Sequence, residues 1–206
     1  MPRRMERSLD IGTSCRYEWK RGGVEKVMKL IGTALEGAYV VESVIHRDRR
    51  GSFLEIFNAD ALARCGLHVS FVQDNCSHSL EAGVIRGLHF QRAPHAQAKL
   101  VWTLTGSVYD VIVDLRKGSR TYLRWEAFEL SAGKPLMVFV PRGFAHGFCT
   151  LEADTRVFYK VDAPYNPQAE GGIRWNDPDL AIPWPADSPV LSDKDAGLPL
   201  LKHQGC

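Results

Sequence analysis

Residues 99–115, KLVWTLTGSVYDVIVDL, decide the fold class of this chain. Two short runs, 99–105 and 107–115, are dominated by the β-branched and aromatic residues that favour strands. The Thr105-Gly106 pair joins them, and glycine accepts the backbone conformation that a tight turn demands. The segment therefore predicts two antiparallel strands connected by a hairpin turn.

Further short runs of the same kind flank this hairpin on both sides, punctuated by Gly, Pro, Asp and Asn. They cover residues 38–45, 52–57, 70–73, 84–90, 122–130, 136–140 and 155–161. Before the last third of the chain, only 58–65 predicts a helical turn. Many short strands with almost no helix are typical of a β-sandwich or barrel, so we expect an all-β fold.

The two ends of the chain differ from this central region. Residues 1–27 are rich in arginine and lysine, and the Gly22-Gly23 pair interrupts any periodicity, so we predict a poorly ordered extension with strands beginning after Met28. Beyond Pro164 the chain is rich in Pro, Asp and Trp. This composition predicts a tail wrapped on the barrel with short helical turns. We therefore expect a single domain over residues 28–206.

Composition narrows the classes of function. A hydrophobic content of 45% in 206 residues supports a full core, and a net charge of +2 is too weak to predict a nucleic-acid partner. No run approaches the ~18 apolar residues of a membrane span, and the basic N-terminus lacks the apolar segment of a secretory signal. Five scattered cysteines without a CxxC pair argue against a disulfide framework. We expect a cytoplasmic protein without a membrane or nucleic-acid partner.

Residues 141–146, PRGFAH, resemble the second conserved motif of cupins, in which Pro and Gly shape a turn and the His points into the barrel. This resemblance implies a cupin-type jelly-roll barrel. The first cupin motif is altered here. Counting back seven residues from Gly106 places Lys99 at the glutamate position, and Ala93 and His95 at the two histidine positions. Because an ammonium group repels a divalent cation, we expect no metal and no other cofactor.

Seven segments, in order along the chain, resemble those of the dTDP-4-dehydrorhamnose 3,5-epimerase family. They are 48–55 (DRRGSFLE), 73–75 (QDN), 84–91 (VIRGLHFQ), 97–101 (QAKLV), 158–167 (FYK and YNP), 175–178 (WNDP) and 191–195 (LSDKD). The similarity runs from about residue 28 to about residue 201. It implies epimerisation at C3 and C5 of dTDP-4-keto-6-deoxy-D-glucose through an enolate, and a homodimer whose sites are lined by both chains.

The resemblance implies four catalytic residues, and each suits its role chemically. His89 would be the base, because imidazole accepts protons near neutral pH, and Asp195 would hold its other ring nitrogen. Strand alternation puts Tyr159 on the face of Val157 and Val161, so its hydroxyl could act as the acid inside the barrel. Lys99 would stabilise the enolate oxygen as a fixed positive charge.

The same resemblance implies a set of substrate-binding residues. Arg50 and Arg86 would bind the diphosphate, because guanidinium groups match phosphate oxygens. The others are Glu55, Gln73 and Asn75 for the nucleoside or sugar hydroxyls, His146 for the sugar pocket and Tyr165 for stacking. Arg86 and His89 are three residues apart, so strict alternation would face them oppositely. Either Gly87 hosts a bulge, or Arg86 serves the neighbouring subunit's site.

Three alternatives remain open at the level of sequence. An epimerase acting at C3 or C5 only, or on another nucleotide-linked 4-keto sugar, would use the same scaffold. A non-catalytic sugar-binding cupin would keep the arginines and lose the acid and base. Because both His89 and Tyr159 are present, we favour proton transfer on two faces and hence the double epimerase.

Overall fold

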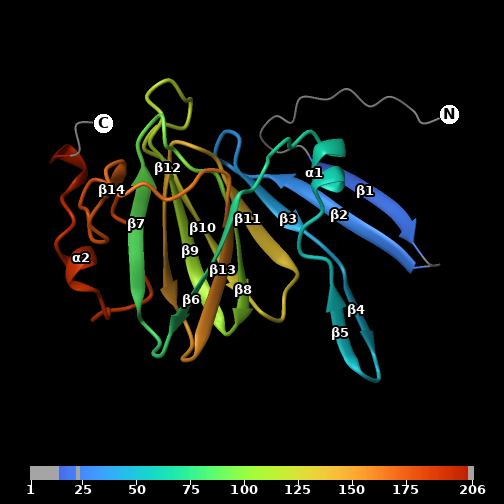
Figure 1. The fold of residues 1–206 in the computed structure, drawn as a ribbon. Helices are drawn as coiled ribbons and strands as arrows, with labels where there is room; N and C mark the ends of the chain where they lie inside the picture. The colour runs from blue at the N-terminus through green and yellow to red at the C-terminus, as the bar shows by residue number, and fades with distance from the viewer. Residues whose placement is uncertain (1–13, 22–23, 204–206) are drawn as a thin grey trace.

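The computed structural model describes residues 14–21 and 24–203, and nearly all of the regular structure in them is β-sheet. Two antiparallel sheets pack against each other (Figure 1). The larger has the strand order β1-β2-β3-β11-β8-β13-β6, and the smaller the order β10-β9-β12-β7-β14. Non-consecutive neighbours in both sheets mean that the chain crosses repeatedly between the layers. This architecture confirms the predicted all-β jelly-roll barrel.

The strands of the larger sheet are β1 Ser14–Arg21, β2 Val24–Gly32, β3 Tyr39–Glu42, β11 Leu136–Val140, β8 Lys99–Thr105, β13 Thr155–Val161 and β6 Gln73–Ser79. Those of the smaller sheet are β10 Trp125–Ser131, β9 Ser107–Asp114, β12 Phe144–Thr150, β7 Ile85–Gln91 and β14 Glu170–Gly172. A separate hairpin, β4 Ile45–Asp48 and β5 Gly51–Leu54, projects away from the barrel (Figure 1).

The barrel interior is filled by alternate residues of both sheets. Val101 and Val157 from the larger sheet meet Ile112, Phe144 and other buried residues of the smaller sheet in one apolar cluster. Tyr159 packs against the same cluster. Side chains that alternate with these therefore face outward, and the strand pattern decides which polar residues can reach the interior.

Each sheet also has a covered outer face. Helix α1, Ala59–Arg64, buries Ala61 and Leu62 against the larger sheet, close to the predicted helical turn at 58–65. Asn58 caps its first turn by accepting a hydrogen bond from the backbone N–H of Ala61 at 3.0 Å. The smaller sheet is covered by the C-terminal tail.

That tail adds β14 as an edge strand beside β7 and then buries Ile173 and Leu180 against the outward residues Leu88 and Phe90. It ends with two short helical turns, α2 Asp193–Ala196 and η1 Leu201–His203. The predicted wrapped tail is thereby confirmed. The part of the chain described contains no helix long and apolar enough to cross a membrane.

The structure corrects several predicted boundaries. The described strands begin at Ser14 rather than after Met28, because β1 pairs along its length with β2, and β2 pairs in turn with β3. Residues 1–13 lie outside the described part. The run predicted at 70–73 is shifted to β6. Five of the described strands were not predicted, namely β1, β2, β4, β12 and β14.

Candidate active site

A histidine–carboxylate pair joins the smaller sheet to the tail. His89 lies on β7, and its Nε2 is 2.5 Å from Oδ1 of Asp195 in α2. Ser192 caps α2 and also donates a hydrogen bond from its hydroxyl to the other carboxylate oxygen, at 3.0 Å. Burial raises the pKa of Asp195, but the His89 and Ser192 hydrogen bonds and the Lys194 charge outweigh it, so the pKa is lowered. Asp195 therefore stays ionised and orients the imidazole.

A register shift in β7 aligns Arg86 with His89. His89 pairs with His146 of β12 and Arg86 pairs with Phe148, so one residue of β7 is extra between them. Gly87 occupies this position with φ of +122°, and a Cβ there would lie 2.7 Å from the Gly147 Cα. Only glycine fits such an approach. The bulge therefore lies at Gly87, where an extra residue brings Arg86 and His89 to the same face of β7.

The larger sheet presents Tyr159 and Lys99 from its inner face. Tyr159 pairs with Val101 of β8 and with Asn75 of β6. The Lys99 Nζ lies 5.9 Å from the centre of the Tyr159 ring. Gln73 lies two residues before Asn75 on the same face, and its amide donates to the Asn75 side chain at 2.8 Å. Four of the predicted residues therefore line one wall of the barrel.

Burial sets the protonation states on this wall. It lowers the pKa of Lys99 to about 8, although the charges of Asp110 and Glu170 oppose this change. It also raises the pKa of Tyr159, against a smaller opposite effect of the Arg86 charge. At neutral pH the phenol thus carries its proton, and Lys99 is mostly charged. The wall can donate a proton and stabilise a negative oxygen.

A second histidine–carboxylate pair lies deeper in the barrel. His146, on β12 beside His89, has its Nε2 2.8 Å from Oδ2 of Asp110 on β9. Asp110 is fully buried, and none of the described residues forms a hydrogen bond with its other oxygen, Oδ1. A buried acceptor without a partner is costly, so this oxygen faces a place where a polar ligand or water is favoured.

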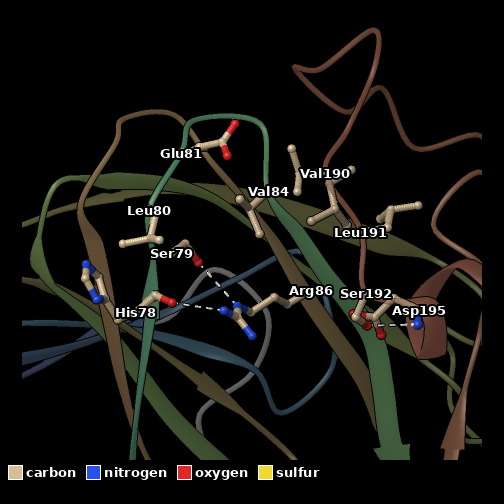
Figure 2. Close-up of a pocket in the computed structure, with 11 residues that line it drawn as sticks. His78, Ser79, Leu80, Glu81, Val84, Arg86, Val190, Leu191, Ser192 and Asp195 are labelled. Carbon is tan, nitrogen blue, oxygen red and sulfur yellow. Dashed lines mark hydrogen bonds between the residues drawn. The ribbon is translucent and has the colours of Figure 1, made fainter.

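Arg86 bridges the two sheets at their open edge. Its guanidinium donates to the Ser79 hydroxyl at 3.2 Å and to the His78 carbonyl at 3.0 Å, both on β6. Figure 2 shows these bonds on the wall of a cavity of about 310 Å³ that also includes Asp195. The Arg86 side chain points toward β6 rather than toward Asp195 (Figure 2). A fixed positive group at the cavity wall suits an anionic ligand.

A further cavity of about 290 Å³ reaches His89 from the side of β14. Its wall includes Glu170, whose carboxylate is bound by Lys194 at 2.6 Å and by the Tyr165 hydroxyl at 2.9 Å. The Tyr165 backbone N–H also donates to the Gln73 side chain at 3.3 Å. Burial raises the pKa of Glu170, but the Lys194 and Tyr165 hydrogen bonds lower it overall, so the carboxylate stays charged.

Two predicted binding residues lie apart from this group. Arg50 is at the tip of the projecting β4–β5 hairpin, 83% exposed at its side chain and paired with Asp48 at 2.6 Å. Glu55 follows that hairpin and accepts a hydrogen bond from Asn58 at 2.7 Å, just before α1. Within one chain the fold therefore gathers His89, Asp195, Tyr159, Lys99, Gln73, Asn75, Arg86, His146 and Tyr165, and leaves Arg50 and Glu55 outside the group.

Comparison with known proteins identifies the family of this chain. The model of the dTDP-4-dehydrorhamnose 3,5-epimerase family matches residues 32–203. The chain belongs to this family. It is similar to a solved dTDP-4-dehydrorhamnose 3,5-epimerase from Bacillus anthracis with TDP and pyrophosphate bound, at 53% identity and a TM-score of 0.83, covering 84% of this chain and 99% of that one.

Two further epimerases are also similar to this chain. A dTDP-6-deoxy-D-glucose-3,5-epimerase from Legionella pneumophila, solved with dTDP-4-keto-L-rhamnose, is 42% identical with a TM-score of 0.81, over 85% of this chain and 94% of that one. The dTDP-4-dehydrorhamnose 3,5-epimerase of Methanothermobacter thermautotrophicus is 45% identical over 81% of this chain and 91% of its own length.

Sequence reasoning did not single out three residues that this member of the epimerase family brings to the site. Asp110 was detectable in principle, because a carboxylate within the apolar run Ser107–Asp114 must find a partner when buried. Glu170 and Lys194 lie in the tail, which has no periodicity from which their direction could be inferred. Their position depends on how the tail docks.

The three residues that the count places at the metal-ligand positions of the first cupin motif do not all point into the barrel. Ala93 and His95 lie in an exposed loop after β7, while Lys99 alone points into the barrel. Among residues 14–21 and 24–203, no three His, Cys, Asp or Glu side chains are grouped as metal ligands. Within that part of the chain, the histidines of this epimerase-family site are each paired with a carboxylate instead.

Proposed function

We propose that this chain epimerises C3 and C5 of dTDP-4-keto-6-deoxy-D-glucose through an enolate, giving dTDP-4-keto-L-rhamnose. The observation that carries this proposal is His89 on the smaller sheet, 2.5 Å from Asp195 of the tail, with Tyr159 and Lys99 on the inner face of the larger sheet. A base and an acid on opposite walls are what inversion at carbon requires. The family's activity in the relatives described above supports the same conclusion.

In this mechanism His89 removes a proton from a carbon beside the C4 ketone, and the electron pair of the broken C–H bond moves onto the ketone oxygen. Asp195 stabilises the imidazolium that forms. Lys99 stabilises the enolate oxygen, since its ammonium group is held in a poorly solvated position. Tyr159 then donates its proton to the opposite face of the carbon as the ketone re-forms. Tyr159 is reprotonated from solvent, and His89 releases the proton it removed to solvent. No redox change occurs.

Substrate binding extends this proposal to the remaining residues. Arg86 would bind the diphosphate, Gln73 and Asn75 the sugar or nucleoside hydroxyls, His146 the sugar, and Tyr165 a ring face. Arg50 and Glu55 lie away from the site of their own chain, so we propose a homodimer in which the projecting hairpin of each copy serves the site of the other. We also propose a cytoplasmic location, because an odd number of cysteines without a CxxC pair argues against a structural disulfide framework.

Deuterium incorporation tests the proposed reaction directly. The chain, pretreated with chelator, is incubated with dTDP-4-keto-6-deoxy-D-glucose in deuterated water, and NMR follows C3 and C5. We expect uptake at both carbons, and its loss in His89→Ala. His95→Ala is the matched control, because His95 is exposed in a loop and should leave uptake unchanged.

The other outcomes select among the alternatives. Uptake at one carbon would replace the proposal with a mono-epimerase. Uptake that stops after chelation would overturn metal independence. An absence of uptake despite tight binding of the nucleotide sugar would point to a sugar-binding protein, and an absence of both would point to a different nucleotide sugar.

A further inference from the structure

Two cysteines far apart in sequence meet on the outer face of the larger sheet. Cys15 lies on β1, and Cys65 is the residue that ends helix α1. Their sulfur atoms are 2.7 Å apart, although the residues are 50 positions apart. A disulfide bond is about 2.05 Å long, so the sulfurs lie within about 0.7 Å of bonding distance. A hydrogen bond between thiols is weak, and the value of this placement lies in the covalent bond it permits.

The contact between β1 and α1 does not depend on this pair alone. Arg64, next to Cys65, places its guanidinium 5.1 Å from the centre of the Tyr17 ring, two residues from Cys15. Cys15 and Tyr17 share a face of β1, and both pack against the apolar cluster that α1 covers. Two side chains of one strand thus contact the end of one helix, which holds the sulfurs in register.

We propose that Cys15 and Cys65 form a reversible disulfide that fastens the N-terminal strand to helix α1. The oxidant is a small-molecule disulfide such as oxidised glutathione. The Cys15 thiolate attacks one sulfur of the oxidant and releases one glutathione thiolate. Cys65 then loses its proton and attacks the Cys15 sulfur of the mixed disulfide, which releases the second glutathione. Two protein thiols are oxidised and one small disulfide is reduced to two thiols.

Accessibility decides which sulfur reacts first. Cys15 is partly exposed and can meet the oxidant, whereas Cys65 is only 4% exposed. Burial, with a smaller effect of the Cys15 thiol, raises the pKa of Cys65 to about 12, so it is a poor nucleophile until a mixed disulfide lies beside it. Of the other cysteines that the structure describes, Cys149 is buried in β12 and Cys76 is exposed on β6.

Peptide mapping tests the bond. Trypsin releases Cys15 in the peptide 8–16, but Cys65 and Cys76 share the peptide 65–86. We therefore use Cys76→Ser, whose exposed site tolerates the change, so that a link to 65–86 can involve only Cys65. After treatment with oxidised glutathione under native conditions, we expect the linked pair 8–16/65–86, its loss after reduction, and its absence when Cys15→Ser is added.

Thermal stability shows whether the disulfide fastens β1 to α1 or forms without an effect on the fold. Closing a loop of about 50 residues should raise the melting temperature of the oxidised wild-type protein by about 5–10 °C over the reduced form. Cys15→Ser should show no such shift while keeping its turnover. The proposal is wrong if, after oxidation, Cys15 and Cys65 in the Cys76→Ser protein carry glutathione or remain free for alkylation without being linked. It is also wrong if the link forms without any change in melting temperature.

Discussion

Replacing Lys99 with methionine should slow the enzyme and at the same time stabilise its fold. Methionine has a similar length and no charge, so the change removes the ammonium group and little volume. Loss of one group that stabilises a developing oxyanion lowers kcat by about 10²–10³-fold in enzymes of this kind. We expect a loss of that size for Lys99→Met, with deuterium uptake reduced at both carbons because both enolates place charge on the same ketone oxygen.

The gain in stability follows from the pKa of Lys99. Burial, partly opposed by Asp110 and Glu170, lowers it from 10.5 to about 8. This difference corresponds to ~3 kcal/mol for keeping Lys99 charged in the fold at neutral pH. Losing the contact with the Tyr159 ring, at 5.9 Å, gives back ~1 kcal/mol. The variant should therefore be more stable by ~2 kcal/mol and melt ~4–8 °C higher.

The sign of the pH dependence can be stated as well. The pKa of Lys99 is lower in the folded protein, so the unfolded chain holds the extra proton between about pH 8 and pH 10.5. Wild-type stability rises with pH across that window, and the advantage of the variant should shrink by about half at pH 9.5. Thermal melts at pH 7 and pH 9.5 measure this.

Lys160→Met is the matched control. Lys160 follows Tyr159 on β13, so its side chain is on the opposite face of that strand, where it binds Asp74 at 2.6 Å. The variant should therefore keep its activity and become slightly less stable. If Lys99→Met kept wild-type turnover, or lost stability as Lys160→Met does, then Lys99 would not be a buried cation at the reacting oxygen.

Three further variants test the rest of the site. Asp195→Asn should lower kcat by about 10³-fold with little change in KM, because His89 loses its charged partner; an equal rise in KM would instead indicate a displaced ligand. Tyr159→Phe should leave binding intact and impair proton return at one carbon, and full activity at both carbons by NMR would remove it as the acid. Gly87→Ala should reduce stability by ~3 kcal/mol or more in denaturant titration, because φ is +122° and a Cβ would meet Gly147; an unchanged midpoint would mean that β7 adapts.

How much of the fold was predictable depends on which strand is considered. The bounds of β8, β11 and β13 follow from the sequence, since apolar β-branched residues recur along each of them. The predicted bounds of β6 were wrong because its sequence, QDNCSHS, is almost wholly polar. Its inner face carries Gln73 and Asn75, two polar side chains that are hydrogen-bonded to each other. Because polar residues occupy these inward positions, β6 lacks the apolar alternation that identifies a strand.

Strand β12 was not predicted, for the opposite reason. All seven of its residues are buried, so it shows no alternation, and its first residues form part of the PRGFAH motif. The individual site residues were predicted from the family resemblance, and strand alternation alone predicted only the inward direction of Tyr159. Cys15 and Cys65 show the limit most clearly, because their spacing of 50 residues suggested no pairing and only the docking of α1 brings them together.

The position of Asp195 has a consequence for the order in which the protein becomes active. His89 precedes its carboxylate partner by 106 residues, and every strand of both sheets is complete by Gly172. A chain still emerging from the ribosome can therefore contain all the strands of the barrel while His89 has no partner. The tail, which follows all these strands in the sequence, would then complete the proposed catalytic pair, so that epimerisation begins only after the tail has docked, and proteolytic loss of the tail would switch it off without removing a single one of these strands.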